Sequence, residues 1–555
     1  MADYTFRGVE IHTEAMWSLA HMENVLNFME KYGMNGLIFH ENGIIDALTW
    51  PETVYSTMEM LRRRPVPMAK INAARIYINM IIRYAKEKNI DLFLEAKELS
   101  FPDSLIELKG DLQNPDGTVC PTNPYWFFLM ESRIRELLHY CPGLGGIIVS
   151  LGTHESRISL ARNSCSCDRC KNTDAVDWYE NLIRAMYKPL SEAGKKLVIR
   201  DFSYTAYHQD CLIQASAKVS TDIIVSLKTT AHDFYIPYPT NSRIGHTHGL
   251  EQWIEYDVWG QFYGDSIYPA SIVEDLRARL RECREKGVSG AYFRTDWEVM
   301  NGITVFNSPN LLNLIGAAIL TGDLNADLDT IYRSWAENGI PTCLLDGTYG
   351  PVSSSPFSLT AWKKLRDFMR RSWDIMRKTH YCRDHNFIEN GQVPDHLEKA
   401  FEWMIDIHGQ DDWSPGASRV LDRTEENIRE IFAEKEWAEQ ELDQAQKELN
   451  IPSLGLSERL AGDMEIILRL YKHFVHMAKI ATISVFLAQK AIETEDPDDM
   501  QKALDTLPPL RDYAGVVEKE LGHTHYPHYI YAHLEPSRLL TLAEDIDRRL
   551  KHGKT

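Results

Sequence analysis

Eight short apolar segments recur between residues 8 and 294, and a stretch with the periodicity of an amphipathic helix separates each one from the next. A strand, a helix and a second strand in succession pair the two strands in parallel, because the helix returns the chain to the same edge of the sheet. Eight such units predict a closed (β/α)8 TIM barrel. An open doubly wound sheet is the alternative, but it would need a glycine-rich phosphate loop after its first strand, where this chain has Thr13 and Glu14. The expected strands cover residues 8–12, 36–40, 91–96, 146–150, 197–201, 223–228, 253–258 and 290–294.

The strand signal stops after residue 306, and only helical patterns follow. Two of these patterns are long: residues 424–450 are rich in charge, and residues 459–494 are more apolar. We therefore predict a barrel domain over residues 1–322 and an all-α domain over residues 323–555. We expect the long amphipathic helices of this second domain either to close one side of the active-site cleft or to form the interface of a homodimer.

The composition narrows the partners and the compartment. A net charge of −20 argues against nucleic acid and against an anionic membrane as the main partner, because both bind through basic surfaces. No run of ~18 or more apolar residues predicts a membrane span, and the N-terminus lacks the pattern of a secretion signal. The nine cysteines are mostly isolated and do not form a disulfide framework. These features predict a cytoplasmic protein with reduced thiols.

Two acids follow strands of the predicted barrel, at the end where (β/α)8 enzymes carry their active sites. Glu155 follows the fourth strand and Asp233 follows the sixth. The cleavage of a glycosidic bond needs two carboxyl groups of this kind. His154 and the apolar strand before it would help Glu155 to keep a proton, as a general acid must. Lys228, five residues before Asp233, would keep Asp233 ionised, as suits a base.

Cations also converge on the predicted mouth of the barrel. Arg200 and Lys228 end neighbouring strands, and two cations in one pocket commonly bind a carboxylate or a phosphate. The alternative for Arg200 is an internal salt bridge with Asp201 or Glu255. Taken singly, most polar residues at strand ends cap helices or face solvent, but so many at one rim indicate a polar site. The other polar residues at this predicted rim are Glu10, His12, Glu14, His40, Glu41, Glu95, Lys97, Glu98, His232, Asp257, Arg294 and Asp296.

Two groups of potential metal ligands stand apart from this rim. Cys165, Cys167 and Cys170 form a C-x-C-x-x-C cluster that lacks an evident fourth ligand, for which Cys120, Cys141 or a nearby histidine would serve. We favour free thiols in a long loop and assign no metal site. The second group consists of histidines near the C-terminus, which we expect at the surface or at the rim of the site: His523, His525, His528 and His533.

Several of these segments resemble glycoside hydrolase family 67, the α-glucuronidases, from about residue 7 to about residue 341. The segments are Arg7-Gly8 before an apolar strand, Val198-Ile199-Arg200-Asp201-Phe202, and Ser226-Leu227-Lys228-Thr229-Thr230-Ala231-His232-Asp233-Phe234. The resemblance implies that Glu155 is the general acid and Asp233 the base. It also implies that Arg200 and Lys228 contact the carboxylate of a uronic acid.

The chain departs from that family at identifiable positions. Gln261 stands where the family has a second carboxylate. Either Asp233 acts alone as the base, or Asp257 or Glu255 replaces the missing acid, or the activity differs from that of the family. Leu151 stands where the family has a lysine near its general acid, and the family's N-terminal β domain is absent. We count Arg200, Lys228, Asp257, Gln261 and Arg294 as candidate substrate-binding residues.

The sequence as a whole predicts an inverting exo-acting hydrolase that removes a terminal uronic acid from a short oligosaccharide without an organic cofactor. Inversion requires carboxyl groups about 6.5–9.5 Å apart. An N-acetylhexosaminidase is an alternative, although it would want an Asp-Glu pair where this chain has His154 and Glu155. A metal-dependent sugar isomerase or epimerase is another, with Glu10, Glu41, Glu155 and His232 as ligands. A sugar-binding protein without catalysis is the third.

Overall fold

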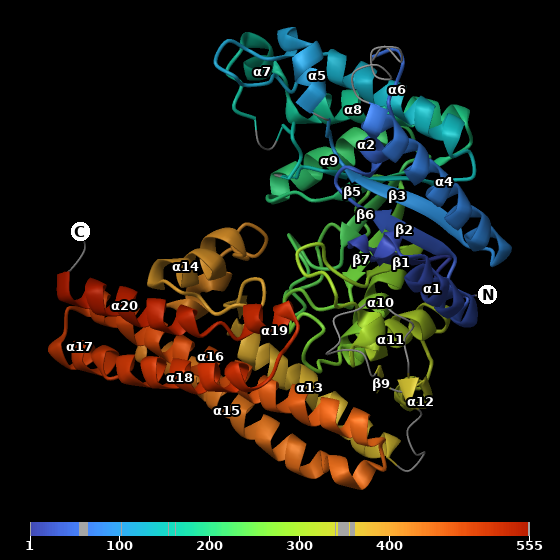
Figure 1. Ribbon diagram of the computed structural model, residues 1–555. Coiled ribbons are helices and arrows are strands. Elements are labelled where there is room, and N and C mark those ends of the chain that lie inside the picture. Colours follow the sequence, from blue (N-terminus) through green and yellow to red (C-terminus); the bar gives the residue numbers. More distant parts are fainter. Residues whose placement is uncertain are drawn as a thin grey trace.

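The structure is a computed structural model that describes residues 2–54, 65–101, 103–153, 155–160, 163–338, 340–341, 354–355 and 361–552. His154 lies outside these residues. Figure 1 shows a barrel formed by the N-terminal part of the chain and, beside it, a layer of long helices formed by the C-terminal part.

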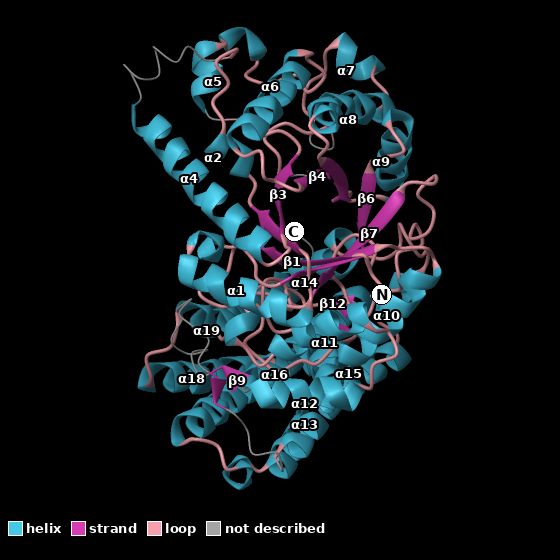
Figure 2. Cartoon of the chain, turned by 90° about the vertical axis from the view of Figure 1, so that its right-hand side faces the viewer, coloured by secondary structure: helices cyan, strands magenta, loops and turns pink. Residues whose placement is uncertain are grey.

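The predicted TIM barrel is confirmed. Eight parallel strands close in sequence order, and each lies within two residues of its expected position. In Figure 2 the strands lie at the centre of the barrel domain with helices around them. The strands are β1 (Phe6–Ile11), β2 (Gly36–His40), β3 (Asp91–Lys97), β4 (Gly146–Leu151), β5 (Lys196–Asp201), β6 (Ile224–Lys228), β7 (Glu251–Asp257) and β8 (Gly290–Arg294).

Helices and short turns lie between these strands and after the last of them. The longer helices are α1 (Leu19–Tyr32), α4 (Pro65–Glu87), α6 (Tyr125–Tyr140), α8 (Ala175–Glu192), α9 (Ala206–Val219), α10 (Val273–Glu285) and α11 (Leu311–Gly322). The shorter elements are η1 (Glu14–Trp17), α2 (Ile44–Leu48), α5 (Asp103–Leu108), η2 (Gly110–Leu112), α7 (Asp168–Asn172) and η3 (Val305–Asn307).

The interior of the barrel changes from apolar to charged along the strands. Side chains in a strand alternate between its two faces, so every second residue points inward. One apolar side chain from each strand fills the lower layer: Phe6, Ile38, Phe93, Ile148, Val198, Ile224, Trp253 and Tyr292. Two residues later along the same strands the inward positions, apart from Gly8 on β1, are polar: His40, Glu95, Ser150, Arg200, Ser226, Glu255 and Arg294. This order places the polar groups at the C-terminal ends of the strands.

The C-terminal part is mainly helical, and the two long predicted helices are present as α15 and α16. Thr424 caps the start of α15, and Asn450 ends it in the left-handed conformation. The helices are α12 (Leu328–Asn338), α13 (Trp362–His380), α14 (Leu397–Phe401), η5 (Glu402–Ile407), η6 (Ala417–Leu421), α15 (Glu425–Leu449), η7 (Ile451–Leu454), α16 (Glu458–Thr494), α17 (Pro497–Leu504), α18 (Leu507–His523), α19 (His528–His533) and α20 (Pro536–His552). The boundary between residues 322 and 323 stays a prediction.

The expectation of helices alone after residue 306 is wrong, because two short antiparallel pairs also form there. They are β9 (Ile340–Pro341) with β10 (Ser354–Ser355), and β11 (Tyr381–Cys382) with β12 (His385–Asn386). The second pair is a hairpin whose two turn residues, Arg383 and Asp384, both have positive φ. Such turns usually carry Asn-Gly, and Arg-Asp gives no comparable sequence signal.

Helix α16 is the one described helix that is long and apolar enough to cross a membrane by length and composition. In its most apolar window, 61% of the residues are buried inside the protein. It contacts α15, α17, α18 and α20, which is the environment of a core helix.

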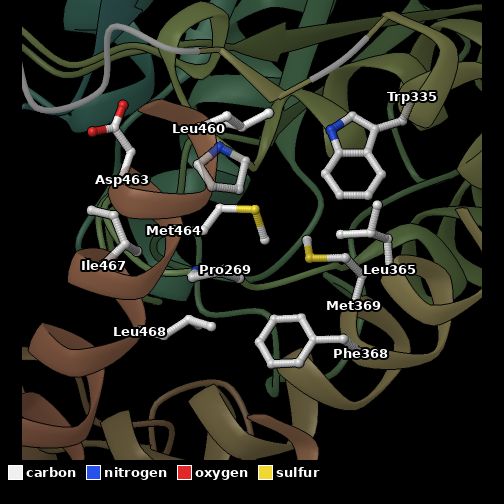
Figure 3. Close-up of a pocket in the computed structure, with 11 residues that line it drawn as sticks. Pro269, Trp335, Leu365, Phe368, Met369, Leu460, Asp463, Met464, Ile467 and Leu468 are labelled. Atoms are coloured by element: carbon white, nitrogen blue, oxygen red, sulfur yellow. The ribbon is translucent and has the colours of Figure 1, made fainter. Parts of the chain in front are cut away.

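Apolar side chains join the barrel to the helical part. Trp335 of α12, Phe368 of α13 and Met464 of α16 line a small cavity of about 30 Å³ (Figure 3). Pro269 and Pro309 of the barrel domain line the same cavity. Buried residues of both parts belong to one continuous hydrophobic cluster, so the two parts share a core.

Close packing at the lower end of the barrel yields a stability prediction. A Cβ atom added to Gly290 would lie 2.4 Å from Cδ1 of Trp253, whose ring stacks on Phe6 at 3.7 Å. We expect Gly290→Ala to cost about 1–3 kcal/mol through overpacking and to lower Tm by about 1–3 °C, measured by thermal unfolding. The control is Gly462→Ala in α16, where a Cβ meets nothing within 4 Å and should stabilise slightly. An equal Tm for both variants would contradict the packing argument.

Candidate active site

Glu155 lies in a tight turn after β4, beside a buried lysine. Gly152 has φ 76°, a conformation that favours glycine, and the Thr153 hydroxyl accepts a hydrogen bond from the Glu155 backbone N–H at 2.9 Å. This turn places Glu155 Oε2 3.0 Å from Nζ of Lys97, the last residue of β3. The Lys97 side chain is 2% exposed and that of Glu155 is 37% exposed, so the acid faces the solvent side of the pair.

Asp233 forms a similar pair after β6. Its Oδ1 lies 2.9 Å from Nζ of Lys228, the last residue of β6, and it also accepts the backbone N–H of Phe234 at 3.0 Å. His232 takes the left-handed conformation at φ 69°, and this reverses the chain within five residues of Lys228. Burial would raise the pKa of Asp233, but Lys228, His232 and Arg294 together hold it below the ordinary value. The charged form that a base requires is therefore favoured.

The ring of Phe202, just after β5, joins the two pairs. Lys97 Nζ lies 4.5 Å from the ring centroid and Lys228 Nζ lies 3.9 Å from it. Glu155 and Asp233 are each one lysine away from the same ring, so the structure brings both acids to the same mouth of the barrel. Tyr204 supports this placement: burial raises its pKa to about 12, and the charges of Asp233 and Glu155 add to the shift.

Arg200 lies beneath this ring and is held inside the barrel. Its Nε and Nη2 donate to the two oxygens of Glu255 at 2.5 and 2.7 Å, and Nη1 donates to Ser150 Oγ at 2.9 Å. Of the two roles open from the sequence, the structure shows the internal salt bridge, with Glu255 as its bidentate partner and Glu95 as a second acid at 3.2 Å. Asp201 bonds elsewhere, to the Ser203 backbone and to Gln209. Because Glu255 already binds the Arg200 guanidinium, direct contact between Arg200 and a substrate is disfavoured.

Asp257, Gln261 and Arg294 form the wall after β7 and β8. The Asp257 carboxylate accepts backbone N–H groups of Trp259, Gly260 and Gln261 at 2.8–3.1 Å, and burial raises its pKa to about 6. Gln261 Oε1 accepts from Arg294 Nη1 at 2.5 Å. Because the Asp257 carboxylate binds three backbone N–H groups, it fixes the shape of the loop after β7.

The two acids considered as replacement bases, Asp257 and Glu255, are both fully buried, and their carboxylate oxygens are already bonded. This leaves Asp233 as the base candidate.

A hollow of about 510 Å³ opens in the same mouth, beside β1, β2 and β8. Glu298 was not predicted from the sequence as a site residue, and its Oε2 lies 2.9 Å from His12 Nδ1. Burial would raise the pKa of Glu298, but His12, Arg294 and Lys97 hold it at about 2. The positive charge of Lys97 thus lowers the pKa of Glu298 in this hollow, and the same ammonium group forms the ion pair with Glu155. The lining residues are His12, Thr13, Glu14, Met16, Trp17, Ser18, Glu41, Glu298 and Asn301.

Among the described residues of the barrel interior, Glu10, His12 and His40 are the group whose ligand atoms lie close enough to hold a metal ion. This set differs from the ligands expected for an isomerase, since Glu41, Glu155 and His232 are not in it. Glu10 Oε1 already contacts His40 Nδ1 at 2.5 Å. Burial lowers the pKa of His40, and several cations add to the shift: Lys97, Arg200 and Arg294.

The helical part contributes residues that the sequence argument missed. His408 Nε2 lies 2.6 Å from Glu389 Oε2, and its Nδ1 bonds the Tyr235 hydroxyl from the loop after β6. Tyr238 donates to the His408 carbonyl at 2.5 Å. These contacts join Asp233's loop to the helical domain. Glu389 and His408 are isolated in the sequence, and no local pattern marks them.

The C-terminal histidines separate into two environments. His523, His525 and His528 are exposed, as expected. His533 is fully buried and lies 2.8 Å from the buried Asp265 of the barrel domain, so its expected surface or rim position is wrong. The spacing of these histidines from Pro527 along the chain does not reveal this difference. His533 is buried because it is the last residue of α19, which turns its side chain inward.

No protein-family model and no curated protein matches this sequence. Solved structures do match. A GH138 enzyme targeting pectin rhamnogalacturonan II has a TM-score of 0.66 at 10% identity, over 99% of this chain and 84% of that one. This chain shares the fold of that enzyme. A family GH115 4-O-methyl-α-glucuronidase with specificity for decorated arabinogalactans gives 0.46 at 12% identity, over 98% and 62% of the two chains. An O-GlcNAc hydrolase mutant of Thermobaculum terrenum gives 0.44 at 13% identity, over 99% and 97%. Both of these TM-scores are too low to show a common fold. The resemblance to family 67 stays a prediction.

Glu98 gives a pH-dependent prediction for the loop that carries Glu155. It accepts a hydrogen bond from the Gly152 backbone, and burial raises its pKa from 4.5 to about 8. The folded state therefore binds a proton that the unfolded chain releases, so stability falls as the pH rises through this window. Glu98→Gln removes the titration. Between about pH 5 and about pH 9 the variant should gain up to a few kcal/mol relative to the unsubstituted protein.

Thermal unfolding at a series of pH values measures this difference. Asp257 and Asp296 titrate in both proteins and cancel in the comparison. The exposed Glu285→Gln serves as the matched control and should follow the unsubstituted protein. Parallel pH curves for Glu98→Gln and the unsubstituted protein would show that Glu98 is charged in the fold.

Proposed function

We propose that this chain is a glycoside hydrolase that removes a terminal uronic acid from an oligosaccharide, with inversion at the anomeric carbon. One observation carries the proposal: two acids, each paired with a buried lysine, meet around Phe202 at the mouth of the barrel. Glycosidic cleavage needs the two acids, and an anionic sugar needs the cations. The fold shared with a GH138 enzyme that targets a pectin supports the reaction class.

In this proposal Asp233 is the base. Its carboxylate is kept ionised by Lys228, and its side chain is 17% exposed, which leaves access for a water molecule. The base removes a proton from that water as the water attacks the anomeric carbon. The pairing with Lys228 also fixes the orientation of the carboxylate.

Glu155 is the proposed general acid, and its ion pair with Lys97 connects proton donation to substrate binding. A general acid must hold a proton until the glycosidic bond breaks. A uronate carboxylate that bonds Lys97 would displace Glu155 from its cation. Lys97 and Lys228 are thus the proposed carboxylate ligands. Arg200 supports them from below through Glu255, and Arg294 and Gln261 form the adjoining wall.

The first test concerns the two acids. Glu155→Gln and Asp233→Asn should each lower kcat by roughly 10²–10⁴-fold while Tm stays close to that of the unsubstituted protein. The assay is release of the uronic acid from a panel of uronic-acid-capped oligosaccharides, with the anomer of the first product followed by NMR. Asp222→Asn, at the opposite end of β6, is the matched control. Normal turnover by either site variant on every uronide would remove that residue from the mechanism, and a retained anomer would overturn inversion.

The second test concerns the charge of the substrate. Lys97→Met and Lys228→Met should each lower kcat/KM for a uronide by roughly 10- to 100-fold, the value of a hydrogen bond between charged groups. The matching neutral hexoside should lose less, so the ratio of the two rates decides. Lys196→Met, at the opposite end of β5, should leave the ratio unchanged. Equal rates of the unsubstituted protein on uronide and hexoside would show that the sugar need not be acidic.

A further inference from the structure

Four cysteines that are far apart in the sequence meet outside the barrel mouth. Cys120 lies in the connection between β3 and α6, and Cys165, Cys167 and Cys170 lie between β4 and α8. Their sulfur atoms all lie within 4.8 Å of one another. The fold therefore supplies the fourth ligand that the sequence did not single out, and it selects Cys120. Cys141 is buried elsewhere, beside Asn79.

We propose that Cys120, Cys165, Cys167 and Cys170 bind one structural Zn²⁺ ion. The Cys120 sulfur lies 3.4 Å from that of Cys170 and 3.7 Å from that of Cys167. A tetrahedral zinc with Zn–S bonds of about 2.3 Å sets its sulfur atoms about 3.8 Å apart. A disulfide would require about 2.05 Å. The two distances at Cys120 fit ligands around a single ion, and all four sulfur atoms lie within 4.8 Å of one another.

The surroundings of the sulfurs suit thiolate ligands. The Cys170 backbone N–H donates to Cys167 Sγ at 3.5 Å, and Asn114 Nδ2 donates to Cys165 Sγ at 3.4 Å. The Thr122 hydroxyl lies 3.1 Å from Cys120 Sγ and 3.4 Å from Cys170 Sγ. Donors of this kind orient metal ligands and spread their negative charge.

The site would join two loops that have little regular structure of their own. The β4 connection runs from Glu155 to the cysteine cluster, and the β3 connection carries α5 and η2. Figure 1 places α5 and α7 at the end of the barrel domain farthest from the long C-terminal helices, where that layer does not cover them. Four thiolates leave no open coordination position, so the ion holds the loops together and takes no part in catalysis.

Metal analysis of the full-length protein tests the proposal directly. The protein, purified with a reducing agent and without chelator, should contain one zinc per chain by elemental mass spectrometry. Replacement of zinc by Co²⁺ should give the intense visible absorption of tetrahedral thiolate-bound cobalt. Cys120→Ser and Cys167→Ser should each lower the affinity for zinc at least about tenfold, measured by competition with a chelator, because one of the four ligands is lost. Cys211→Ser, a buried cysteine of α9 outside the cluster, should keep one zinc.

The measurements on the unsubstituted protein decide the outcome even if a serine variant fails to fold. Absence of zinc together with the lack of a cobalt spectrum would overturn the proposal. Iron in place of zinc, or an intact mass lower by two hydrogens per disulfide between these cysteines, would overturn it as well. Activity on sugars plays no part in the readout, so failure of the proposed function would leave the result on zinc unaffected.

Discussion

Arg200 and Glu255 form a bidentate ion pair inside the barrel, and the arrangement of the mouth depends on it. Breaking such a pair by removing one partner costs about 3–5 kcal/mol, because the other charge is left buried and alone. Arg200 also lies 5.1 Å from the Phe202 centroid, on which Lys97 and Lys228 converge. The charges thus differ in depth. The Arg200–Glu255 pair is buried inside the barrel, and Glu155 and Asp233 at its mouth are partly exposed. Lys97 and Lys228 lie directly behind these two acids, each in an ion pair with one of them.

The helical C-terminal part contacts the loops of the candidate site on the side away from the barrel strands. The loops after β6 and β7 carry a cluster of buried aromatic residues, and Tyr381 of the helical domain completes it. His408 bonds two tyrosines of that cluster, and His533 bonds Asp265 in the loop after β7. Because these are polar bonds within an apolar contact, they fix one relative position of the two parts. The loop that carries Asp233 is therefore held from both sides.

The eight strands could be predicted from the sequence because each is a short apolar run between helical stretches, and β2 and β8 have the predicted limits. Glu155, Asp233 and Lys228 could be placed at the mouth because all parallel strands of a barrel end on the same side. The role of Arg200 could not be decided, because its choice between Glu255 and Asp201 depends on which face of each strand points inward. The β11–β12 hairpin was missed because Arg383 and Asp384 adopt positive φ without the residues that usually mark it.

The sequence by itself determined the barrel, the helical second half and the strand ends that carry charge, because periodicity and strand order are local properties of the chain. The tertiary structure decided which charges are paired, since Lys97 meets Glu155 and Cys120 meets Cys165, Cys167 and Cys170 only after separate loops are folded together. It also decided the contribution of Glu389 and His408, which come from a distant helical segment. Pairings between distant residues depend on distances in space, and no spacing along the chain records them.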